Sequence, residues 1–98
     1  MSGKVFEALR RRAEREPYAA LLGLELVRVD DGYALVRMPF TEKHRNIHGR
    51  CHGGALFSLI DEAFQFASNA GGRIEIALNV NVSYLKAPDD GDILQAEA

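Results

Sequence analysis

Cysteine and long apolar runs are scarce in this chain of 98 residues. The one cysteine, Cys51, cannot form a disulfide within the chain, which is typical of proteins from a reducing compartment. No apolar run approaches the roughly 18 residues of a membrane-spanning helix. The segment from Met1 to Pro17 alternates charged and apolar residues and lacks the apolar core of a signal peptide. We therefore expect a cytoplasmic protein with no membrane partner.

A basic excess is also missing. The chain has 12 lysines and arginines against 14 acidic residues, a net charge of -2 and a pI near 5.9. Binding to phosphate backbones requires an excess of positive charge, so nucleic acid is a poor candidate partner. The length predicts one small domain over residues 1–98, which buries on the order of 60–65% of its unfolded surface. Such a modest core makes association with a partner chain plausible.

The hydrophobic pattern predicts two helices and four strands. An amphipathic helix is expected over Lys4–Glu16, ended by Pro17, and a long helix over Ala55–Asn69, followed by a stop at Gly71-Gly72. The expected strands are Leu24–Val29, Tyr33–Phe40, Ile74–Tyr84 and Asp92–Ala98, the first two joined by a tight turn at Asp30-Asp31-Gly32. This order predicts an α+β fold in which an antiparallel sheet curls around the long helix.

The segment from Asn46 to Asp61 carries the strongest functional signal. It contains Asn46-x-His48-x-x-x-His52-Gly53-Gly54, which opens the long helix, and then Asp61 about two turns further in. Backbone amides at a helix N-terminus can stabilise a developing oxyanion, and glycine lets a substrate approach them closely. We expect the Gly53 amide to be that donor, with support from Gly54.

Asp61 is the first candidate for the reacting carboxylate. Its neighbours on the helix are largely apolar, so we expect the carboxylate to be partly desolvated and a stronger base than in water. The residue can either activate water or attack a carbonyl itself. The pattern of residues leaves both roles open.

This constellation resembles the central-helix signature of hotdog-fold acyl-CoA thioesterases of the phenylacetate-degradation type. The resemblance extends from Leu22-Gly23 to Gly91-Asp92 and implies hydrolysis of aryl- or medium-chain acyl-CoA to the free acid and coenzyme A, with no further cofactor and no metal. It also implies that Asn46, His52 and Gly53 of one subunit meet Asp61 of another. Asn46 would then orient water or the thioester, although a turn-forming role is an equal alternative.

The spacing of the two main residues independently favours a dimer. Gly53 and Asp61 lie eight residues apart, which is roughly 12 Å along a helix axis, so one carbonyl cannot contact both within a chain. A homodimer, or a tetramer built from it, would bring them together across a two-fold axis. His52 is expected to position the glycine turn, and His48 to support it. Residues expected to line the substrate site are Gly54, Phe57, Ser58, Glu62 and Gln65.

The chain departs from the family pattern in two ways, and three alternative functions stay open. Two further strands would follow in that family. Some relatives place a serine on the strand after the long helix, where this chain has Ala77 or Leu78, so the role of that serine is either missing or filled by Asn79 or Ser83. His44, His48 and His52 recur every four residues and could hold a metal, although the residues between them do not form a helical pattern. A hotdog dehydratase or hydratase is a second reading, and a non-catalytic acyl-CoA binding or dimerisation module is a third.

Overall fold

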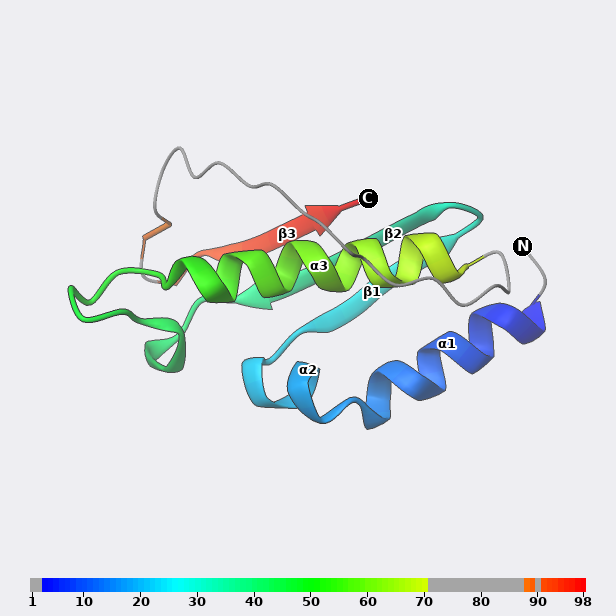
Figure 1. Cartoon of the computed structure of the whole chain (residues 1–98), viewed down its shortest axis with the longest axis horizontal. Coiled ribbons are helices and arrows are strands. Elements are labelled where there is room, and N and C mark those ends of the chain that lie inside the picture. The colour runs from blue at the N-terminus through cyan, green and yellow to red at the C-terminus, as the bar shows by residue number, and fades with distance from the viewer. Residues whose placement is uncertain (1–2, 71–87, 90) are drawn as a thin grey trace.

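The computed structural model describes residues 3–70, 88–89 and 91–98. Its elements in chain order are α1 (Gly3–Arg15), α2 (Pro17–Leu22), β1 (Glu25–Asp30), β2 (Tyr33–Pro39), the 3₁₀ turn η1 (Glu42–His44), α3 (Gly53–Asn69) and β3 (Ile93–Glu97). The strands form one antiparallel sheet in the order β1-β2-β3. Helix α3 lies across one face of this sheet, and α1 and α2 lie along the β1 side (Figure 1). The α+β class predicted from the sequence is confirmed.

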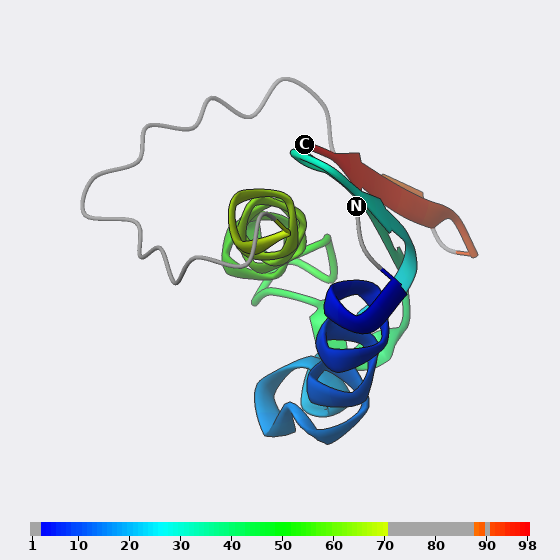
Figure 2. The same ribbon diagram turned by 90° about the vertical axis from the view of Figure 1, so that its right-hand side faces the viewer.

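The core lies between α3 and the sheet (Figure 2). Strand β2 supplies its centre, because Ala34, Val36 and Met38 alternate toward α3 and are fully buried. The other buried apolar residues of the cluster are Val29, Phe40, Cys51, Ala55, Leu59, Ala63, Phe66 and Ala70. Those from α3 recur at helical spacing, so they form the face of the helix that packs on the sheet.

The short helix α2 was not expected from the sequence. Pro17 ends α1 as predicted, but it also stands at the first position of the short helix α2. Proline suits that position because its φ is already helical and no helical partner exists for its missing N–H. Helix α2 then ends at Gly23, whose φ of 75° is in the left-handed region.

The other predicted boundaries agree closely with the structure where it can be compared. The hairpin strands begin and end within one residue of prediction, and α3 begins two residues earlier, at Gly53. The predicted strand Ile74–Tyr84 and the glycine stop at Gly71-Gly72 lie outside the described residues. Within the described part of the chain, no helix is long and apolar enough to cross a membrane.

Candidate active site

His52 holds the glycine turn that opens α3. It occupies the N-cap position in an extended conformation, and its Nδ1 accepts the Gly54 N–H at 2.8 Å. Its carbonyl oxygen accepts the amides of Ala55 and Leu56. Because Nδ1 is an acceptor, the proton of a neutral ring lies on Nε2. This geometry supports the interpretation of His52 as the residue that positions the turn.

The two glycines of the turn have different surroundings. Gly53 is the first residue of α3, where backbone N–H groups carry the positive end of the helix dipole. The Gly54 amide already donates to His52, so its predicted support for an oxyanion would require sharing that hydrogen. A Cβ at Gly54 would lie 3.0 Å from His52 Nδ1, so a side chain there would require the imidazole ring to shift. The Gly53 amide stays the predicted oxyanion donor, whereas the Gly54 amide is part of the hydrogen bonding that shapes the turn.

Asn46 organises the loop that precedes α3. Its side-chain Oδ1 accepts two backbone amides, from His48 at 2.9 Å and from Arg50 at 3.0 Å. The backbone N–H of Asn46 donates to the Arg50 carbonyl, and the backbone carbonyl of Asn46 accepts the Gly49 N–H. Both acceptor sites of Oδ1 are thus used within the loop, and among the described residues the side-chain NH₂ group is the part of Asn46 left to contact a substrate.

Two substitutions of Asn46 separate the role of Oδ1 in holding the loop from the proposed role of the NH₂ group in contacting the substrate. We expect Asn46→Asp to keep the loop, because a carboxylate still accepts both amides, but to lower kcat about tenfold through loss of the NH₂ donor. Asn46→Ala loses the acceptor as well and should also lower the free energy of unfolding by about 1–2 kcal/mol. Denaturant unfolding and thiol-release kinetics measure the two effects. Full activity in Asn46→Asp would leave Asn46 with a loop-forming role alone.

The three histidines considered as metal ligands have different environments. His44 is buried, its Nε2 lies 2.6 Å from the Leu22 carbonyl, and its Nδ1 accepts the Thr41 amide. His48 is exposed on the loop, and His52 is the N-cap of α3. His44 therefore ties the loop to α2 and has no nitrogen left for a metal. Among the described residues, no group of three potential metal ligands comes together.

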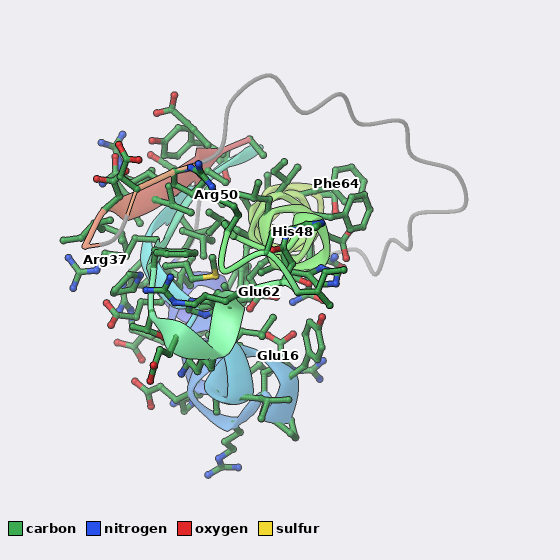
Figure 3. The ribbon with its side chains drawn as sticks, turned by 90° about the vertical axis from the view of Figure 1, so that its left-hand side faces the viewer. Glu16, Arg37, His48, Arg50, Glu62 and Phe64 are labelled. Carbon is green, nitrogen blue, oxygen red and sulfur yellow. The ribbon has the colours of Figure 1, made fainter. Side chains whose placement is uncertain are left out.

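Asp61 lies in the middle of α3, eight residues after Gly53, and its side chain is half-buried. Two large apolar residues near it on the helix, Ile60 and Phe64, are each 42% exposed. Figure 3 shows Phe64 pointing away from both the sheet and the N-terminal helices. Asp61 thus has partly exposed apolar side chains beside it, on a helix that is otherwise packed against the sheet.

The polar residues Ser58, Glu62 and Gln65 lie on a different face of α3. Ser58 is hydrogen-bonded to Tyr18 of α2, and Gln65 donates to both carboxylate oxygens of Glu16 at 3.3 and 3.4 Å. Glu62 is buried and accepts from Gln65 at 3.3 Å. Within one chain these residues contact the junction between α1 and α2. Their role in lining the substrate site stays a prediction.

Glu62 and Glu16 form a carboxyl pair at this junction (Figure 3). Burial, a hydrogen bond with Glu16, and the charges of Glu16 and Asp61 together raise the pKa of Glu62 to about 9. Glu62 therefore carries its proton at neutral pH and hydrogen-bonds Glu16. A hollow beside Glu62 is lined by Arg10, Ala13, Glu14, Leu24, Glu25 and Leu26.

The protonated Glu62 makes stability depend on pH. Between the unfolded pKa of 4.5 and the folded value of about 9, only the folded chain keeps this proton, so stability falls as pH rises. The loss approaches about 1.4 kcal/mol per pH unit. Glu62→Gln stays neutral at every pH. We therefore expect its free energy of unfolding, relative to that of the wild type, to increase from pH 5 to pH 9, as measured by denaturant unfolding. Glu7→Gln, at an exposed position on α1, is the matched control. Parallel curves for wild type and Glu62→Gln would contradict the assignment.

Comparison with known proteins agrees with this arrangement. A family model described as the thioesterase superfamily matches residues 48–98, which include the glycine turn and Asp61. Acyl-coenzyme A thioesterase PaaI of Escherichia coli is 37% identical over 98 residues, covering all of this chain and 70% of that protein. A protein of Archaeoglobus fulgidus, described only provisionally as an esterase, is 42% identical over 78 residues. That match covers 80% of this chain but only 51% of the relative. This chain therefore spans about half the length of that protein.

Solved structures show the same fold. The E. coli PaaI protein from the phenylacetic acid degradation operon superposes with a TM-score of 0.90 at 35% identity, covering 98% of this chain and 70% of that one. A variant of the phenylacetic acid degradation protein PaaI from Thermus thermophilus gives 0.79 at 33% identity, covering 84% and 70%. The chain belongs to the thioesterase superfamily. Its fold is the hotdog fold that the sequence predicted, and the resemblance to the PaaI-type family is confirmed.

Proposed function

We propose that this protein hydrolyses acyl-CoA thioesters to the free acid and coenzyme A. The observation that carries the proposal is the glycine turn at the start of α3, held by His52, with Asp61 two turns further along the same helix. The turn offers a backbone donor for the oxyanion, and Asp61 offers a carboxylate that activates water or attacks the thioester carbonyl. The name of the E. coli relative supports the same substrate class.

We infer that the reacting site lies between two copies of the chain. The roughly 12 Å between Gly53 and Asp61 along α3 prevents one carbonyl from contacting both in a single chain. The partly exposed Ile60 and Phe64 beside Asp61 provide an apolar surface that a second α3 can cover. An antiparallel pair of helices about a two-fold axis then places Asp61 of one copy near Gly53 of the other, twice per dimer.

The acyl group is proposed to lie beside the half-buried Leu56 and Phe57 and near Phe64. Such a lining suits an aryl or medium-length acyl chain, and phenylacetate-type substrates are included in that class. The reaction needs only a donor and a carboxylate, so we propose that it uses no metal or redox cofactor. The proposed enzyme acts in the cytoplasm as a dimer or as a tetramer of two dimers.

Thiol release from a panel of aryl- and fatty-acyl-CoA thioesters tests the proposal. We expect turnover of one or more of these by purified protein, unchanged by a metal chelator, with the dimer observed in the same samples. A folded dimer that binds acyl-CoA without releasing thiol would contradict hydrolysis and favour a binding module. Formation or loss of an enoyl double bond in place of thiol release would favour a dehydratase or hydratase.

A further inference from the structure

Helix α2 contacts the first turns of α3 through a chain of three hydrogen-bonding groups. The Ser58 hydroxyl donates to the Gly54 carbonyl at 2.8 Å, and the Tyr18 hydroxyl lies 2.6 Å from Ser58 Oγ. A serine hydroxyl has one hydrogen, and a carbonyl cannot donate. The hydrogen between the two side chains must therefore come from Tyr18. The order of donation is Tyr18 to Ser58 to the Gly54 carbonyl.

These linked hydrogen bonds complete the restraint on Gly54. His52 Nδ1 accepts the Gly54 N–H, and Ser58 donates to the Gly54 C=O, so side chains hold both peptide units that flank Gly54. The restraint matters because two consecutive glycines at a helix start have the greatest backbone freedom of any residue pair. The direction of the Gly53 N–H depends on how firmly this first turn is held.

Tyr18 stands outside the core that folds the chain. Its side chain is 54% exposed, whereas Ser58 is only 9% exposed and lies on the α3 face turned toward α2. A tyrosine in this position contributes little apolar burial, and its hydroxyl makes its one described polar contact with Ser58. Loss of the hydroxyl should thus affect the turn more than the overall fold.

We propose that Tyr18 is a positioning residue, which acts through Ser58 to fix the glycine turn of the active site. The proposal rests on the thioesterase function proposed above. Tyr18 touches neither the substrate nor the reacting atoms. It sets how precisely the oxyanion donor is aimed, and so it affects the rate of the chemical step and not the binding of the substrate.

The test compares Tyr18→Phe with Tyr33→Phe. Both substitutions remove one tyrosine hydroxyl from a hydrogen bond, but the Tyr33 bond is to Glu97 at 2.7 Å on the sheet. We expect Tyr18→Phe to lower kcat about three- to tenfold with KM within twofold of wild type, and Tyr33→Phe to change neither. We also expect faster hydrogen exchange at the amides of Gly54, Ala55 and Leu56 in Tyr18→Phe alone.

A double-mutant cycle with Ser58→Ala shows whether Tyr18 acts through Ser58. We expect Tyr18→Phe to add no further loss of kcat in the Ser58→Ala background. Full additivity, unchanged hydrogen exchange at the turn, or an effect on KM alone would each overturn the inference. If the wild-type protein itself releases no thiol, the proposed function fails instead, and that failure is visible before any substitution is made.

Discussion

Replacing Asp61 by asparagine should lower kcat at least about a hundredfold while leaving the fold and the dimer intact. Asparagine keeps the shape of the side chain but can neither accept a proton from water nor attack a carbonyl. Losing a general base typically costs about 10²–10⁴ in rate. The measurement is thiol release under saturating acyl-CoA, with thermal unfolding and oligomeric state recorded on the same preparation.

Glu62→Gln is the matched control for this substitution. Glu62 is the next residue on α3 and undergoes the same chemical change, but its side chain faces Glu16 and Gln65. Since Glu62 is already protonated at neutral pH, its replacement by glutamine should leave kcat at pH 7 within about threefold of wild type, and its predicted role in lining the substrate site would appear as a change in KM. A large loss in Glu62→Gln with little loss in Asp61→Asn would show that Asp61 is not the reacting carboxylate.

Replacing Gly53 by proline should lower kcat about 10²–10³-fold, the usual cost of removing one oxyanion donor. Proline has no backbone N–H, so the substitution deletes the proposed donor directly. The backbone at this position suits proline, because Gly53 is the first residue of α3 and its φ is not positive. His52, with φ −66° and ψ 132°, already has the extended backbone that a following proline requires.

Gly53→Ala separates the effect of removing the N–H from the effect of adding a side chain. Alanine keeps the amide and adds only a methyl group, so we expect it to retain more activity than Gly53→Pro by at least about tenfold. Both variants should unfold at a denaturant concentration close to that of the wild type. Equal activity in the two variants would indicate that the Gly53 amide does not stabilise the oxyanion.

The sequence predicted the fold well where hydrophobic periodicity is strong. Strand β2 alternates buried and exposed residues, and α3 repeats apolar residues at helical spacing, so both patterns follow directly from packing on one core. Helix α2 was not predicted, because six residues after a proline are too few to show a period. The proline at its first position was the available signal.

The sequence predicted the candidate site less completely. The sequence analysis assigned the polar residues of α3 to one site, but the structure divides them between two faces of the helix. Ser58, Glu62 and Gln65 are spaced by four and three residues and contact the α1–α2 junction, whereas Asp61 lies beside exposed apolar side chains. The spacing alone could have separated them, but the partner residues Glu16 and Tyr18 are more than 35 positions away in the chain.

The most direct test of the account is to mix the two inactive variants, Asp61→Asn and Gly53→Pro, and let their subunits exchange. If each site takes Gly53 from one copy and Asp61 from the other, every mixed dimer contains one site with both defects and one intact site. Thiol release should then recover to about a quarter of the wild-type rate, since half of the dimers are mixed and half of their sites are intact. A mixture that shows exchanged subunits but only the summed residual activities of the two variants would contradict a site shared between copies.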